Sequence, residues 1–310
     1  MQTLWGPLLR RARRRALIRE RWDTPDGDFV DLDWLPSGAG RTVLLLHGLE
    51  GSSTSHYVFG LLDEIAAQGW RAAVLNFRSC SGELNRLPRF YHSGDTGDLD
   101  HVLRVLTERE PALLVGAVGI SIGGNVLLKW LGEQGETAPK SLAGAVAISV
   151  PFDLQACARV MDRGLQRRLY TASFMRSLKM KTRAKAQAYP GFVDIERALR
   201  ARTFAAYDRA VTAPLHGFAD EVDYWTRSSS GPYLARIRRS TLLISALDDP
   251  FVPPASLPEP SALPPAVRAE FVPHGGHVGF VEGPPWRATS WAERRAVDFL
   301  ASVLQGGGVC

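Results

Sequence analysis

Short apolar runs alternate with stretches of helical spacing through the first half of the chain. The runs cover residues 42–46, 71–77, 112–118 and 142–149. Between the first two, apolar residues recur every three or four positions from Ser55 to Gln68, and Gly69 follows as a typical helix stop. Near-continuous apolar strands that alternate with amphipathic helices predict a mostly parallel sheet covered by helices on both faces.

An alternating stretch comes before the first of these runs. From Glu20 to Trp34, polar and apolar residues alternate on both sides of Pro25-Asp26-Gly27, a sequence that favours a tight turn. This pattern predicts an antiparallel hairpin at the edge of the sheet. Residues 1–21 are rich in arginine, and we expect them to form a short basic helix.

The strand pattern stops at Pro151 and resumes at Thr241. Residues 152–232 contain helical stretches without a convincing strand, which predicts an inserted helical cap. Beyond it, two further strands are predicted at residues 241–247 and 269–272, and a closing helix at residues 286–304. We therefore expect an eight-stranded α/β core in two parts, residues 22–151 and 233–305, with a flexible tail at residues 306–310.

The net charge of +5 is concentrated in two segments. Residues 159–185 hold nine Lys or Arg against one acid, and residues 10–21 hold seven Arg against one acid. We interpret both segments as solvated helix faces, with contact to an anionic membrane surface or substrate as the alternative. No nucleic-acid-binding module is recognisable, so a nucleic-acid partner is not expected.

The remaining composition indicates a cytoplasmic protein. No apolar run approaches the about 18 residues that a membrane-spanning helix requires, and the N-terminal residues lack the pattern of a signal peptide. The three cysteines, Cys80, Cys157 and Cys310, are too scattered for a disulfide framework or a zinc site.

The segment Gly119-Ile-Ser121-Ile-Gly123 lies between a predicted strand and a predicted helix. In this context G-x-S-x-G predicts a sharp turn that exposes a nucleophilic serine, because the two glycines avoid a clash between strand and helix. The turn also directs the free N–H groups at the start of the helix toward the group that the serine attacks. Taken alone, so short a pattern also fits a Gly-rich turn with an incidental serine.

A serine nucleophile needs a base, and the base needs an acid that orients it. Asp248 and Asp249 follow the strand predicted at residues 241–247, and His277 follows the strand predicted at residues 269–272. The chain order Ser, Asp, His and the positions at the carboxyl ends of strands are typical of the α/β-hydrolase fold. We therefore predict a catalytic triad with Ser121 as its nucleophile.

Two choices remain within this triad. We favour Asp249 as the acid, because Asp249-Pro-Phe-Val-Pro253 fits the usual form of this loop, and keep Asp248 as the alternative. We favour His277 as the base over His274, because neighbouring glycines allow the backbone to bring its ring over the serine. A metal site at His274 and His277 lacks further ligands at suitable spacing, so no metal is predicted.

Acyl transfer also requires donors for the oxyanion that forms on the substrate. The backbone N–H of Ile122, the residue after the nucleophile, is the first candidate. The second candidate is the N–H of Leu49, in the Gly-rich loop that follows residues 42–46. We expect His47 to hold this loop in place, and we expect Arg78 and Glu83 to form a local ion pair in another loop.

Taken together, several segments resemble the α/β-hydrolase family of predicted bacterial hydrolases, which also contains plant EMB8-like proteins and mammalian abhydrolase-domain lipases. The resemblance extends from about residue 30 to about residue 300. It rests on His47-Gly-Leu-Glu-Gly-Ser-Ser53, Asn76-Phe-Arg-Ser-Cys-Ser-Gly-Glu83, Tyr91-His-Ser-Gly94 with Asp98, Gly119-Ile-Ser-Ile-Gly-Gly-Asn125, Asp248-Asp-Pro-Phe251 and His274-Gly-Gly-His-Val-Gly-Phe280. It implies a serine esterase or lipase for short- to medium-chain acyl esters, with the second acid of the Asp248-Asp249 pair in the triad.

We therefore expect a carboxylic-ester hydrolase that works through an acyl-enzyme and needs no metal or organic cofactor. Its expected partner is a small-molecule acyl ester. The alternative is a lipid, phospholipid or thioester substrate with peripheral membrane contact, which the basic segments motivate. A non-catalytic binding protein on the same fold is a third hypothesis, disfavoured because candidates for the triad and for both oxyanion donors are present.

Overall fold

Eight strands form one sheet in a computed structural model that describes residues 2–3, 15–36, 38, 40–284 and 288–305. The strand order is β1-β2-β4-β3-β5-β6-β7-β8. The pairs β1–β2 and β2–β4 are antiparallel, and all other pairs are parallel, so the predicted hairpin and mostly parallel sheet are confirmed. The strands are β1 (Ile18–Asp23), β2 (Phe29–Leu35), β3 (Arg41–Leu46), β4 (Arg71–Asn76), β5 (Leu114–Ile120), β6 (Leu142–Ile148), β7 (Ser240–Ala246) and β8 (Val267–Val272).

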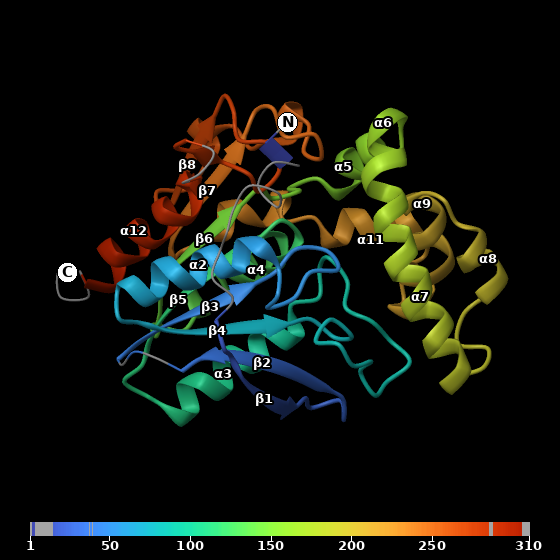
Figure 1. Ribbon diagram of the computed structural model, residues 1–310, viewed down its shortest axis with the longest axis horizontal. Helices are drawn as coiled ribbons and strands as arrows, with labels where there is room; N and C mark the ends of the chain where they lie inside the picture. Colours follow the sequence, from blue (N-terminus) through green and yellow to red (C-terminus); the bar gives the residue numbers. More distant parts are fainter. Residues whose placement is uncertain (1, 4–14, 37, 39, 285–287, 306–310) are drawn as a thin grey trace.

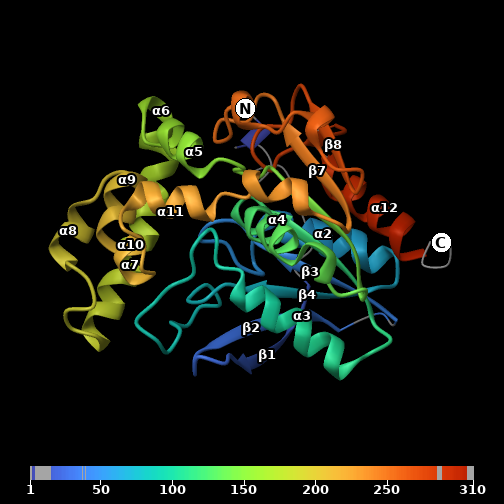
Figure 2. The same ribbon diagram turned by 180° about the vertical axis from the view of Figure 1, so that it is seen from behind.

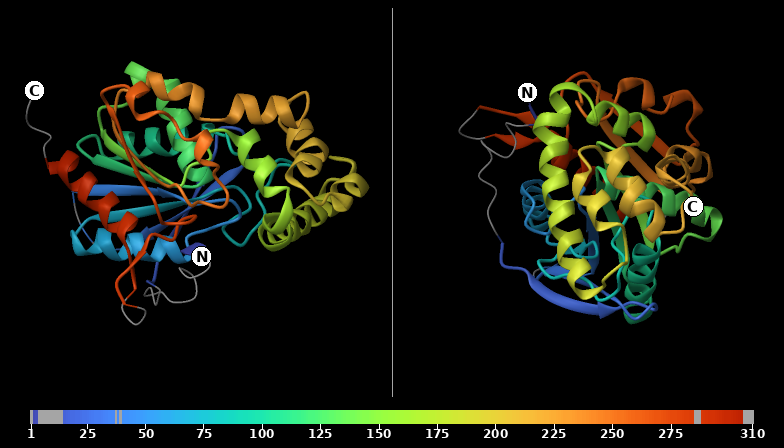
Figure 3. Two further views of the ribbon diagram at one scale, coloured as in Figure 1. Left: turned by 90° about the horizontal axis from the view of Figure 1, so that it is seen from above. Right: turned by 90° about the vertical axis from the view of Figure 1, so that its right-hand side faces the viewer.

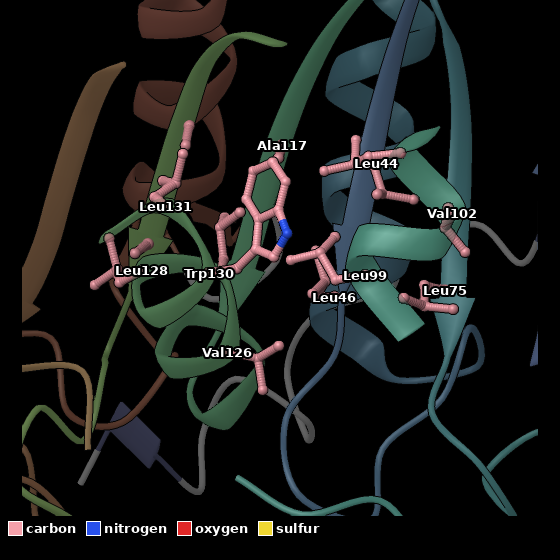
Figure 4. Close-up of a cluster of buried hydrophobic side chains, with 14 of the residues drawn as sticks. Leu44, Leu46, Leu75, Leu99, Val102, Ala117, Val126, Leu128, Trp130 and Leu131 are labelled. Atoms are coloured by element: carbon pink, nitrogen blue, oxygen red, sulfur yellow. The ribbon is translucent and has the colours of Figure 1, made fainter. Parts of the chain in front are cut away.

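Helices cover both faces of this sheet (Figures 1 and 2). Helices α2 (His56–Ala67) and α12 (Trp291–Gln305) pack on one face, and α3 (Gly97–Arg109) and α4 (Ile122–Gln134) pack on the other. Each face has its own hydrophobic core. Figure 4 shows the second core, in which side chains of α3 and α4 meet those of the central strands. The prediction of a sheet covered on both faces is confirmed.

A buried arginine joins the edge hairpin to the centre of the molecule. Arg78 follows β4 and is only 4% exposed. Its guanidinium binds Asp26 at 2.7 Å, Asp28 at 3.0 Å and Asp98 at 2.6 Å. The predicted pair between Arg78 and Glu83 is wrong, because three carboxylates from the hairpin and from α3 already surround this guanidinium.

The chain between β6 and β7 is helical, apart from its loops. Apart from residues 231–236, which pack against α4, it lies beyond the carboxyl ends of the parallel strands (Figure 3). Its two ends meet at the sheet, where Gly231 N–H donates a hydrogen bond to the carbonyl of Phe152 at 3.0 Å. The elements are α5 (Leu154–Met161), α6 (Gly164–Gln166), η2 (Arg167–Thr171), α7 (Ala172–Ala188), α8 (Ile195–Arg200), α9 (Phe204–Tyr207), η3 (Asp208–Thr212), α10 (Ala213–Leu215), α11 (Glu221–Ser228) and η4 (Gly231–Arg236).

Two predicted helix boundaries differ from the structure. The basic helix expected over residues 1–21 cannot extend to its predicted end, because β1 begins at Ile18 and pairs with β2. Most of that segment, residues 4–14, lies outside the described residues, as does the predicted tail at 306–310. The closing helix begins at Trp291 rather than at residue 286, because Thr289–Ser290 forms strand β10, which pairs with β9 (Val281–Glu282). Among the helices described, none is long and apolar enough to cross a membrane.

Candidate active site

Ser121 lies at the sharp turn between β5 and α4. Its backbone has φ 55° and ψ −120°, a strained conformation for a residue with a side chain. A Cβ atom on Gly123 would lie 2.4 Å from the carbonyl oxygen of Leu46, and one on Gly119 would lie 2.5 Å from the carbonyl oxygen of Gly123. Both glycines are therefore needed for the close approach of strand and helix that raises Ser121 above the sheet.

A chain of hydrogen bonds connects Ser121 to a buried acid. Ser121 Oγ lies 3.0 Å from His277 Nε2, and His277 Nδ1 lies 2.8 Å from Asp249 Oδ2. The side chain of Asp249 is fully buried, and its other oxygen accepts a hydrogen bond from Phe251 N–H at 2.8 Å. These contacts hold the carboxylate in line with the imidazole, an arrangement in which Nδ1–H donates to Asp249 and Nε2 is free to accept from Ser121.

The two alternative residues face elsewhere. Asp248 accepts hydrogen bonds from the backbone N–H groups of Gly275 and Gly276 at 2.8 and 2.7 Å, so it shapes the loop that carries His277. The side chain of His274 is 80% exposed, and its Nδ1 lies 3.5 Å from Asp248. The structure therefore brings Asp249 and His277 to the serine and leaves Asp248 and His274 outside this chain of hydrogen bonds.

The loop after β3 faces the same serine. Gly48 N–H donates to the hydroxyl of Tyr57 at 2.9 Å, and Glu50 N–H donates to the hydroxyl of Tyr91 at 2.8 Å. The N–H of Leu49 lies between them, and no hydrogen bond occupies it among the described residues. This leaves Leu49 N–H available to a bound group.

The other candidate donor is the N–H of Ile122, and His47 holds the loop after β3. Ile122 is the first residue of α4, so its N–H has no carbonyl partner in a preceding turn. His47 is completely buried, which lowers its pKa to about 4 and keeps it neutral. Its Nδ1–H donates to the carbonyl of Gly48 at 2.8 Å, and its Nε2 accepts from Phe77 N–H at 3.1 Å. His47 therefore connects the loop after β3 to the end of β4.

A pocket of about 180 Å³ opens beside Ser121, and its wall is mostly apolar. The core supplies residues such as Leu49, Ile122 and His277, and the helical segment supplies a large part of the remaining wall. Its lining from that segment comprises Leu154, Cys157, Ala158, Met161, Phe174, Phe204, Asp208, Tyr224 and Trp225. Such a pocket can accommodate an apolar group attached to the carbonyl that Ser121 attacks.

Asp208 is the buried carboxyl at one wall of this pocket. It also lines a neighbouring cavity of about 70 Å³, which shares Leu49 and Phe204 with the first. Its Oδ1 accepts a hydrogen bond from Thr212 at 2.7 Å, and its Oδ2 accepts one from Trp225 Nε1 at 2.9 Å. Burial raises the pKa of Asp208 to about 7 despite these two bonds. The mostly apolar wall therefore includes a buried polar group, which both cavities share.

The pocket residues of the helical segment escaped sequence analysis. Helical spacing indicates which residues share a face of a helix but not which face meets the core. The sequence therefore gave no indication that Phe204 and Asp208 line the pocket. Phe251 was a partial exception, since it lies within the loop predicted to carry the acid. Its ring packs against the His277 ring with centroids 4.3 Å apart.

Comparison with known proteins shows the family to which the chain belongs. A family model described as alpha/beta hydrolase fold matches residues 41–284. The Escherichia coli (strain K12) protein named "Putative esterase YheT" is 39% identical over 311 residues, which cover 98% of this chain and 91% of that protein. The human phospholipase ABHD3 is 28% identical over 316 residues, which cover 99% of this chain and 77% of that protein.

Solved structures resemble the chain in fold. The esterase Pf2001 of Pyrococcus furiosus superposes with a TM-score of 0.60 at 18% identity, covering 93% of this chain and 92% of that one. At this level of identity the likeness concerns the arrangement of strands and helices. The chemistry must be argued from the site itself.

Proposed function

Because the chain belongs to the α/β-hydrolase family and is an ester hydrolase, we propose that Ser121, His277 and Asp249 form its catalytic triad. One observation carries this proposal: the unbroken contacts from Ser121 Oγ to His277 Nε2 at 3.0 Å and from His277 Nδ1 to Asp249 at 2.8 Å. A serine hydroxyl becomes a useful nucleophile when a base at hydrogen-bond distance removes its proton. The relatives named as an esterase and a phospholipase support the same chemistry.

The proposed reaction proceeds through an acyl-enzyme. Ser121 Oγ attacks the ester carbonyl while His277 Nε2 takes its proton, and Asp249 stabilises the resulting imidazolium. The N–H groups of Leu49 and Ile122 bind the oxyanion, and His277 then protonates the departing alcohol. Water, deprotonated by His277, attacks the acyl-enzyme and releases the carboxylic acid and Ser121.

We assign the apolar pocket to the acyl chain. Its apolar lining favours methylene groups, whereas contact between a methylene group and the carboxyl of Asp208 is unfavourable. This arrangement supports short- to medium-chain acyl esters as substrates. Hydrolysis rates for p-nitrophenyl esters from acetate to palmitate would test the assignment, and an optimum at palmitate would contradict it.

A fluorophosphonate probe tests the triad. The wild-type protein is expected to react with the probe and to hydrolyse p-nitrophenyl butyrate, and Ser121→Ala is expected to lose both activities. Ser53→Ala, a change at another buried serine, serves as the control. Undiminished labelling or hydrolysis by Ser121→Ala would reject the proposed nucleophile and would favour the non-catalytic hypothesis or another site.

A second candidate function, hydrolysis of esters at a lipid surface, is favoured by the outer face of one long helix. The elements α6, η2 and α7 form this helix, and no Asp or Glu occurs between Arg163 and Ala188. Leu165 and Leu169 are 65% and 50% exposed, and arginines lie beside them in the sequence. Exposed leucines among cations are typical of helices that bind anionic lipid surfaces.

This helix also lies beside the proposed site. The ring of Tyr170 contacts that of Phe251, with centroids 4.7 Å apart, and Phe251 contacts His277. A lipid held at Leu165 and Leu169 would therefore be close to the triad.

Vesicle co-sedimentation tests the lipid function. The wild-type protein is expected to sediment with anionic phospholipid vesicles, and Leu165→Ser with Leu169→Ser is expected to abolish this while hydrolysis of p-nitrophenyl butyrate is unchanged. Ile18→Ser, at an apolar residue 61% exposed on β1, is the matched control. If the wild-type protein does not bind vesicles, or if the double variant binds as well as it does, the lipid function is rejected.

A further inference from the structure

Helix α7 directs a row of polar side chains toward the core. Ser177, Lys181 and Lys185 are four residues apart and so share one face of the helix. Lys185 is only 1% exposed, and it donates hydrogen bonds to the carbonyl oxygens of Asn85 and Leu87, each at 2.5 Å. The expectation that the basic residues of this segment form a solvated face is therefore wrong for the inner side of α7.

Glu50 receives the other two side chains of this row. Its Oε1 accepts a hydrogen bond from Lys181 Nζ at 2.9 Å, and its Oε2 accepts one from Ser177 Oγ. The side chains of Glu50 and Lys181 are only 6% and 15% exposed. Burial opposes the charge on Lys181, but Cys80 and Glu50 outweigh this effect and raise its pKa above its ordinary value. Lys181 is therefore charged at neutral pH and forms a largely buried ion pair with Glu50.

The backbone of Glu50 is held as firmly as its side chain. Its φ is 55°, an unfavourable value for a residue with a side chain, which the surrounding contacts must maintain. The hydroxyl of Tyr91 accepts from Glu50 N–H at 2.8 Å and donates to Glu50 Oε1 at 3.0 Å. The ring of Tyr91 stacks on Phe77 with centroids 5.1 Å apart. Glu50, which follows the proposed oxyanion donor Leu49, is therefore held by contacts from the core on one side and from α7 on the other.

We propose that Glu50 and Lys181 are positioning residues that aim the Leu49 N–H at the oxyanion. Gly48, bonded to Tyr57, anchors the loop one residue before this donor, and Glu50 anchors it one residue after. The donor can keep its direction only while both anchors hold. The inference rests on the proposed function, because an oxyanion forms only if Ser121 attacks a carbonyl.

This role makes the helical segment part of the catalytic geometry as well as part of the pocket. A movement of α7 away from the core separates Lys181 and Ser177 from Glu50, which leaves the loop that carries Leu49 held from the core side alone. Because an oxyanion donor acts on the transition state, its misalignment lowers kcat and kcat/KM together and leaves KM nearly unchanged. Loss of the acyl pocket would instead raise KM.

The test compares variants of α7 in the full-length protein. Lys181→Met is expected to lower kcat for p-nitrophenyl butyrate by about 10- to 100-fold with little change in KM. It is expected to weaken inhibition by a trifluoromethyl ketone, which forms a tetrahedral adduct, by the same factor. Lys181→Arg retains the charge and is expected to restore most of the activity. Arg183→Met, on the exposed face of the same helix, is the control.

A double variant separates positioning from folding. Lys181→Met leaves the carboxylate of Glu50 buried without its partner, so its Tm is expected to fall. Glu50→Gln with Lys181→Met removes both charges and is expected to recover Tm while kcat stays low. Recovery of kcat together with Tm would overturn the proposal, as would wild-type kcat and inhibitor affinity in folded Lys181→Met. Activity that persists in Ser121→Ala would overturn the proposed function instead.

Discussion

At the scale of single residues, Asp248 and Asp249 are neighbours with different partners. Asp249 meets the imidazole of His277, whereas Asp248 meets the backbone of Gly275 and Gly276. We predict that Asp249→Asn lowers kcat for p-nitrophenyl butyrate by about 10⁴-fold, because the amide favours the wrong tautomer of the base. Asp248→Asn keeps one acceptor oxygen for the loop and is expected to lower kcat by less than about 10-fold.

Steady-state kinetics of the two variants, with circular dichroism to verify folding, measure this difference. Equal losses, or a larger loss in Asp248→Asn, would reverse the assignment of the acid. The sequence favoured Asp249 through the form of its loop and kept Asp248 as the alternative, and the structure gives the two adjacent carboxylates different hydrogen-bond partners.

The buried carboxyl of Asp208 is expected to make stability depend on pH. Burial raises its pKa from 3.8 to about 7, while the bonds from Thr212 and Trp225 oppose the shift and the charges of Asp162 and Glu221 reinforce it. The folded chain therefore keeps this proton at pH values where the unfolded chain has lost it. The stabilisation is complete below about pH 4 and is lost as the pH rises through about 7, at up to about 1.4 kcal/mol per pH unit.

Asp208→Asn removes this titration. Between pH 5 and pH 8, we expect the free energy of unfolding of the variant to rise by about 2 to 3 kcal/mol relative to the wild-type protein. Urea unfolding at both pH values measures the change, and Asp298→Asn, at an exposed acid, is the control. A constant difference between variant and wild type across this range would show that Asp208 does not titrate there.

At the scale of elements, Arg78 joins the β1–β2 hairpin to β4 and α3. Burial alone would raise the pKa of Asp26, but hydrogen bonds from Arg78 and Thr24 hold it well below its ordinary value. Arg78→Met leaves buried carboxylates without this partner. We predict a loss of about 3 to 5 kcal/mol in the free energy of unfolding at pH 7.

The same variant has a distinctive pH dependence. Stability from an acid with a lowered pKa is present above its ordinary pKa and is lost as the pH falls, so the deficit of Arg78→Met is expected to shrink below about pH 4. Denaturant unfolding across this range tests it. Arg104→Met, which breaks an exposed pair with Glu108, is expected to cost less than about 1 kcal/mol. A similarly small cost for Arg78→Met would contradict the buried ion cluster.

Strands could be predicted wherever the pattern of apolar residues fitted only one kind of secondary structure. Buried parallel strands read as continuous apolar runs, and the alternation around Pro25-Asp26-Gly27 allowed only a hairpin, so all eight strands could be predicted. The segment between β6 and β7 was predicted to be helical, but the way its helices pack on the core could not be predicted. Buried lysines such as Lys181 and Lys185 resemble surface residues in sequence, since their partners lie about 100 residues or more away in the chain.

At the scale of the whole molecule, one part of the candidate site could be predicted from the sequence and another part could not. Ser121, Asp249 and His277 could be predicted because each follows a strand, and the carboxyl ends of parallel strands meet at one edge of the sheet. The pocket could not be predicted, because its wall depends on how helices dock over that edge. Phe204 and Asp208 reach the pocket only through this docking.

The hydrogen bond between Gly231 and Phe152 has a consequence for how such enzymes diversify. Since the helical segment leaves the core and returns to it at one point, its length and shape can change without altering the spacing of β6 and β7. Descendants could inherit the proposed nucleophile, base and acid unchanged while the helical segment that forms the pocket wall is replaced. Glu50 limits such replacement. A new segment has to supply a partner for Glu50, because without one the proposed oxyanion donor would lose its direction and hydrolysis would slow.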